Sequence, residues 1–109
     1  MTSTALLTTA ASLIRNSFSL VGASAGNTHN ETLEALHAAL THRISEMLQN
    51  DPGLLSNILY RIDVAETTVR EITERQPPGD VPFQLATLII ERQLEKAKWR
   101  AKMKDSAGQ

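Results

Sequence analysis

Apolar residues recur at every third or fourth position along almost the whole chain. Between Leu6 and Val21, for example, they include Ala10, Ile14 and Phe18. This spacing places the apolar side chains on one face of an α-helix. No segment alternates apolar and polar residues long enough to predict a strand. The sequence therefore predicts an all-α fold, a small bundle of four to five helices.

Capping residues predict where the central helices begin. Thr28 and Glu31 have the spacing of a capping box and predict the start of a second helix, whose apolar stripe ends near Leu48. Either Asn50 or Asp51 can cap a third helix, because Pro52 then falls in its first turn, where a missing N–H costs little.

The C-terminal half continues with one short and one long helix. Asp63 and Glu66 repeat the capping spacing and predict a fourth helix directly after the third. Residues 76–79, with two prolines and a glycine, end it. A last helix then runs from about Val81 to Lys104, and we expect residues 105–109 to be a frayed tail.

The 109 residues predict one domain, because a single core does not need to split at this size. Residues 1–27 form an N-terminal helix and linker that can be loosely attached, and whether this helix packs on its own chain or on a neighbouring copy stays open. They carry Arg15 as their sole charge and lack the basic start of a signal peptide, so we expect no signal peptide. No apolar stretch approaches about 20 residues, so we expect no membrane span.

The last helix carries a predicted core face and a predicted solvated face. At 100° per residue, one group of side chains gathers where core contact is expected, and a charged group gathers elsewhere. The core group is Ala86, Ile89, Ile90, Gln93 and Ala97. The solvated group is Gln84, Glu91, Glu95, Lys98 and Lys102.

A further line of side chains on this helix is unusual for a small monomer. We call it the Trp99 strip, and it consists of Leu85, Leu88, Arg92, Trp99 and Met103. The strip either packs on the first helix or forms a subunit interface, because Trp, Met and Arg are enriched at association surfaces. Both arrangements can hold at different ends, since the helix spans about 36 Å and the shorter helices cannot all reach Trp99.

Catalytic and metal-binding patterns are weak in this sequence. The chain has no cysteine, and no Gly-x-Ser-x-Gly turn or phosphate-binding loop is present. Glu34 and His37 have the Glu-x-x-His spacing of di-iron bundles, but that spacing occurs once and lacks the partner carboxylates. We therefore predict no enzyme activity, no metal and no cofactor, and expect His37 to be a packed, hydrogen-bonded histidine. Tyr60 falls opposite the apolar face of its helix and predicts a surface contact.

Nucleic-acid binding is the alternative function. Residues 58–75 resemble a helix-turn-helix in hydrophobic spacing, but the bulky Leu59 stands where a small residue is usual, and the turn lacks glycine. Glu66, Glu71 and Glu74 in the second of these helices would repel phosphates. Six basic residues against one acid lie between Arg92 and Lys104, which suits either phosphate contact or a helix C-terminus.

Two segments carry a resemblance to known proteins. Residues 59–64, Leu-Tyr-Arg-Ile-Asp-Val, and residues 85–94, Leu-Ala-Thr-Leu-Ile-Ile-Glu-Arg-Gln-Leu, resemble a group of small, uncharacterised bacterial helical proteins. The resemblance covers roughly the C-terminal half. It implies a bacterial cytoplasmic helical domain and transfers no activity.

These observations favour a helical interaction or assembly protein. We expect it to self-associate, or to bind another protein, through the Trp99 strip on its C-terminal helix, with no membrane contact. The alternative is a nucleic-acid-binding regulator that uses residues 58–75 or the basic final turns.

Overall fold

The computed structural model describes residues 4–20 and 32–107, and these residues form helices without any strand. The predicted all-α fold with a long C-terminal helix is confirmed. The helices are α1 (Thr4–Phe18), α2 (Leu33–Asn50), α3 (Pro52–Arg61), α4 (Glu66–Arg75) and α5 (Val81–Ala107).

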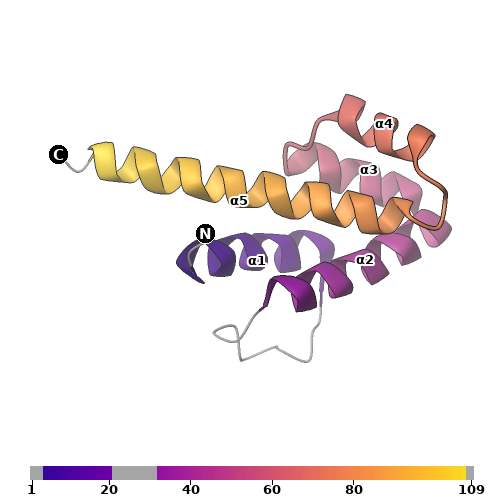
Figure 1. Ribbon diagram of the computed structural model, residues 1–109, viewed down its shortest axis with the longest axis horizontal. Helices are drawn as coiled ribbons and strands as arrows, with labels where there is room; N and C mark the ends of the chain where they lie inside the picture. The colour runs from indigo at the N-terminus through magenta and orange to yellow at the C-terminus, as the bar shows by residue number, and fades with distance from the viewer. Residues whose placement is uncertain (1–3, 21–31, 108–109) are drawn as a thin grey trace.

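The long helix α5 is the axis on which the other helices pack. Helices α1 and α2 lie along one side of it, while α3 and α4 gather beside its N-terminal half (Figure 1). The C-terminal end of α5 extends past the N-terminal end of α1. One apolar core joins α1, α2, α3 and α5, and half-buried side chains of α4 pack against it. None of the described helices is long and apolar enough to cross a membrane.

The N-terminal helix is firmly part of this core. Ile14 and Phe18 of α1 are completely buried, so α1 contributes to the core of its own chain. The helix ends because Ser19 adopts a left-handed conformation with φ 55°, which lets the Leu20 N–H donate to the Arg15 carbonyl. From α2, Arg43 Nε donates to the Phe18 carbonyl at 3.0 Å. Residues 21–31, which include Val21 and the expected linker, lie outside the described residues.

The cap residues of α2 and α3 agree with the predictions to different degrees. Helix α2 begins after Thr32, whose hydroxyl accepts from the Ala35 N–H at 3.0 Å, so its cap is not the predicted Thr28, which lies outside the described residues. Helix α3 is capped by Asp51, whose Oδ1 accepts from the Leu54 N–H at 3.2 Å, and this prediction is confirmed.

The prediction that Asp63 caps α4 is wrong. The N-cap of α4 is Ala65, which has no side-chain cap. Asp63 instead ends α3, because its left-handed conformation, φ 67°, allows the Val64 N–H to donate to the Leu59 carbonyl and the Asp63 N–H to the Tyr60 carbonyl. This Schellman motif turns the chain sharply and brings residues 62 and 63 against α5.

The long helix begins at Val81 as predicted but continues further than expected. Fraying was expected from residue 105, whereas α5 runs to Ala107. The sequence offers no proline or glycine before Gly108, so nothing in it interrupts the helical hydrogen bonds earlier. Residues 108–109 lie outside the description.

Candidate functional site

The Trp99 strip divides into an inner and an outer part. Leu85 is 1% exposed and belongs to the core, so it is unavailable for contact with a partner. Leu88 is half-buried against the core and lines a groove beside Val64 and Ala65 of the α3–α4 turn. The inner part of the strip therefore packs within its own chain, Leu85 in the core and Leu88 beside the α3–α4 turn.

Three side chains of α5 hold the α3–α4 turn in place. Arg92 Nε donates to the Asp63 carbonyl at 3.1 Å, and Arg92 Nη2 pairs with the Asp63 carboxylate at 3.1 Å. The buried Gln93 donates to the Ile62 carbonyl at 3.1 Å, and Lys96 Nζ reaches the same carbonyl at 3.4 Å. Arg92 is thus committed to its own chain, which makes it the boundary between the two parts of the strip.

The outer part of the strip is exposed to solvent. The side chains of Trp99 and Met103 are 63% and 55% exposed, and every side chain from Lys98 to Met103 is exposed. This follows from length, because α5 has 27 residues and α1, which runs beside it, has 15. This exposure agrees with the expectation that the shorter helices cannot all reach Trp99. A groove of about 580 Å³ lies between this end and the α3–α4 turn, bordered by Trp99, Arg92 and Asp63.

The charged group of α5 lies where the sequence predicts it. Glu91, Glu95, Lys98 and Lys102 are all exposed, while Gln84 is half-buried. Glu95 also accepts from Arg92 Nη1 at 3.1 Å, and its side chain is 72% exposed. Exposed acids therefore precede exposed bases along one side of the helix.

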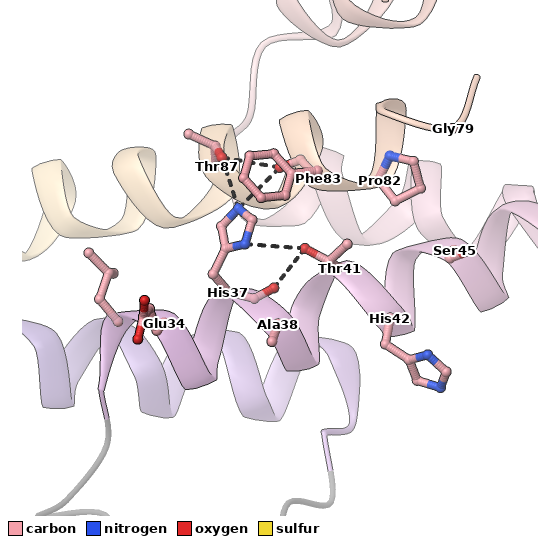
Figure 2. A pocket seen from close by; sticks show the side chains of 11 residues that line it. Glu34, His37, Ala38, Thr41, His42, Ser45, Gly79, Pro82, Phe83 and Thr87 are labelled. Carbon is pink, nitrogen blue, oxygen red and sulfur yellow. Dashed lines mark hydrogen bonds between the residues drawn. The ribbon is translucent and has the colours of Figure 1, made fainter. Parts of the chain in front are cut away.

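A second hollow lies between α2 and the start of α5 (Figure 2). It has a volume of about 880 Å³, and exposed Leu33 and Phe83 contribute to its wall. The ring of Phe83 meets His37 edge-on, with 4.3 Å between ring centroids. His42 points away from His37 and pairs weakly with Glu46 at 3.9 Å.

His37 joins α2 to α5 by hydrogen bonds. Its Nε2 lies 2.9 Å from the Thr87 hydroxyl and 3.2 Å from the Phe83 carbonyl, and its Nδ1 lies 3.3 Å from the Thr41 hydroxyl (Figure 2). The Phe83 carbonyl can only accept, so a bond to it requires the proton on Nε2. Thr87 then donates to the Phe83 carbonyl at 3.1 Å, and Thr41 to the His37 carbonyl at 2.7 Å.

This arrangement agrees with the predicted packed, hydrogen-bonded His37. The two ring nitrogens face the hydroxyl groups of Thr41 and Thr87 and the carbonyl of Phe83 (Figure 2). Among the residues that the structure describes, no three His, Asp or Glu side chains gather closely enough to hold a metal ion.

The segment that resembles a helix-turn-helix, residues 58–75, is fixed to α5 at its turn. Its turn is occupied by Asp63 and held against α5 by Arg92. Glu66, Glu71 and Glu74 of α4 are exposed, as is Tyr60, at 85%. Helix α4 therefore presents exposed carboxylates, which repel phosphates, beside the exposed Arg70 and Arg75.

Sequence reasoning did not find the role of Asp63 or of Thr87. Asp is common both at N-caps and in left-handed positions, so its spacing to Glu66 gave a misleading signal. Thr87 lies 50 positions from His37, and no local pattern connects residues at that separation.

No family model matches this chain, and neither the curated proteins nor the solved structures give a match. The resemblance to small bacterial helical proteins therefore stays a prediction.

Proposed function

We propose that this chain is a non-enzymatic helical interaction protein that associates through the outer end of α5. The observation that carries the proposal is the exposure of Trp99 and Met103 together on a helix end that no other described helix covers. An exposed tryptophan beside an exposed methionine is the composition of a contact surface, since large apolar side chains gain free energy when a partner shields them from water.

The architecture supports this role. The inner half of α5 is fixed by the core and by the α3–α4 turn, so the outer end is presented by a rigid base. A partner that binds there loses little free energy in ordering the helix, because the helix is already formed. The bacterial and cytoplasmic setting implied by the sequence resemblance is part of the same proposal.

Nucleic-acid binding is a second candidate, supported by one observation. Lys96, Lys98, Arg100 and Lys102 lie along the outer end of α5 around Trp99, and Lys98 to Lys102 are exposed. Basic side chains beside an exposed aromatic ring can contact phosphates and stack on a base. The acids Glu91 and Glu95 on the same side of the helix weigh against it, because they repel phosphates.

Light scattering of the intact chain tests the first candidate. We expect a mass above that of the monomer, and we expect Trp99→Ala to lower this mass while circular dichroism stays unchanged. Truncating a central aromatic side chain of an interface typically costs about 2 kcal/mol or more, which is about a thirtyfold loss of affinity. Tyr60→Ala is the control, since it removes an exposed aromatic side chain of α3 and leaves Trp99 and Met103 in place.

Two outcomes would count against self-association. A monomeric mass for the intact chain at millimolar concentration would remove it, and so would an unchanged mass in the Trp99→Ala variant. If the chain instead bound heparin and duplex DNA, with an affinity that fell steeply with salt, nucleic-acid binding would replace it.

A further inference from the structure

We infer that α5 pairs in antiparallel orientation with α5 of a second copy of this chain, with Glu91 and Glu95 of each copy facing Lys102 and Lys98 of the other. This inference rests on the proposed function and specifies its partner, orientation and register.

The four charged residues form one continuous row. They follow one another at spacings of four, three and four residues, which places them on one side of an α-helix. All four side chains are exposed. The row begins with two acids and ends with two bases. Trp99 directly follows Lys98, so it lies about 100° around the helix from that residue. We call this row the charged row.

Antiparallel pairing makes the charged row complementary to itself. A two-fold axis between Lys96 and Ala97 brings position 91 level with position 102 of the second copy, and position 95 level with position 98. Each contact then joins a carboxylate to an ammonium group, and the symmetry produces four such pairs. A parallel pairing in register would place acids beside acids and bases beside bases, which is unfavourable.

The neighbouring elements leave this side of α5 open. Helix α1 packs against α5, and its Leu6 shares a hollow with Leu94 and with Glu91, Glu95 and Lys98, so α1 borders the charged row along one side. The α3–α4 turn covers the other side at Arg92, Gln93 and Lys96. A second helix therefore has access to the strip between these two covers, which includes Trp99 and the charged row.

The same register gives Trp99 a place to bind. Trp99 of the second copy comes level with Leu94, next to Arg92 and Glu95, where the groove of about 580 Å³ borders the α3–α4 turn. An indole there is shielded from water and lies near the Arg92 guanidinium, a favourable cation–π partner. Arg100 of the second copy comes level with position 93, near the Asp63 carboxylate, whose side chain is 73% exposed.

The charge pattern favours a second copy over a nucleic acid. A polyanion would gain from Lys98 and Lys102 but would be repelled by Glu91 and Glu95 in the same row. A second copy uses all four charges. The charged row is therefore more complementary to the same row of an antiparallel second copy than to a row of phosphates.

Charge reversal of the row tests the register. One variant carries Glu91→Lys and Glu95→Lys, a second carries Lys98→Glu and Lys102→Glu, and a third carries all four changes. In sedimentation equilibrium we expect each of the first two variants to dimerise at least about tenfold more weakly than the intact chain, because four attractive pairs become repulsive. The third variant should return to within about threefold of the intact chain.

Mixing provides the sharpest measurement. Each of the first two variants repels a second copy of itself, but the two variants complement each other, so an equimolar mixture should form a heterodimer more strongly than either variant dimerises alone. A variant with Glu71→Lys and Glu74→Lys on α4 is the matched control, since it changes net charge by the same amount as the first variant away from the row. Its dimerisation should stay within about threefold of the intact chain.

The outcomes separate the register from the proposed function. If the intact chain dimerises and Trp99→Ala weakens the dimer, but the fourfold variant and the mixture fail to recover association, the register is wrong and the proposed function stands. If the intact chain is monomeric, both fall. Binding of duplex DNA by the monomer, lost in the Lys98→Glu, Lys102→Glu variant, would also overturn the pairing.

Discussion

The two halves of α5 have similar patterns and opposite environments. The inner half presents Leu85, Ile89 and Gln93, each no more than 1% exposed, to the core of the bundle. The outer half carries Trp99 and Met103 of the Trp99 strip. Both residues are more than half exposed to solvent. The comparison shows that whether the apolar side chains of a long helix are buried depends on how far the helices packed beside it extend. Beyond that point the side chains stay exposed and are available to a binding partner.

The largest expected effect is the difference in stability loss between a substitution in the inner half of α5 and one in the outer half. Leu85→Ala should lower the free energy of unfolding by about 2–4 kcal/mol, because it leaves a cavity in a closed core. Met103→Ala removes a side chain of similar size from an exposed position and should change it by less than about 0.5 kcal/mol. Urea denaturation at a concentration where the chain is monomeric measures both. Equal losses would show that the outer end is buried within the monomer.

How much of this contrast the sequence reveals depends on the residue. The 3.6-residue period was sufficient to predict that Ala86, Ile89 and Gln93 face the core, since each helical turn repeats the signal. The same period assigned Leu85 and Trp99 to one strip and could not separate them. Their environments differ because Leu85 lies in the core, whereas every described side chain from Lys98 to Met103 is exposed, a property of tertiary packing rather than of local pattern.

The boundary between the halves shows a second limit of sequence reasoning. Asp63 has a spacing that fits an N-cap, but the structure uses it in a left-handed turn and as the partner of Arg92. The local preference of Asp for the two positions is similar. What decides between them is Arg92, 29 residues away along the chain, and this tertiary contact leaves no trace in local spacing.

Substitutions at Asp63 test how strongly the α3–α4 turn is held at the boundary between the two halves of α5. Asp63→Ala should lower the free energy of unfolding by about 1–2 kcal/mol, because alanine is strained at φ 67° and the Arg92 guanidinium loses its carboxylate. Asp63→Asn tolerates the left-handed conformation and removes only a largely exposed ion pair, so its loss should stay below about 1 kcal/mol.

A glycine at the same position isolates the backbone contribution. Asp63→Gly relieves the left-handed strain and should be less destabilising than Asp63→Ala, although it also loses the ion pair. Thermal or urea unfolding of the three variants gives the order. If Asp63→Ala were as stable as Asp63→Asn, the turn would owe little to the conformation of residue 63, and the ion pair with Arg92 would be its main support.

The smallest expected effect concerns the polar contact at the inner half of α5. Thr87→Val keeps the shape of the side chain but removes the hydroxyl that bonds His37 Nε2 and the Phe83 carbonyl, so unfolding should become easier by about 1 kcal/mol. Thr87→Ser keeps the hydroxyl and should retain most of that stability. Thr73→Val is the matched control, because the Thr73 hydroxyl bonds a carbonyl of its own exposed helix at 2.9 Å, and its loss should cost less than about 0.5 kcal/mol. A Thr87→Val variant as stable as the control would mean that α2 and α5 are joined by their apolar core alone, and that the contrast between the two halves of α5 rests on burial rather than on hydrogen bonds.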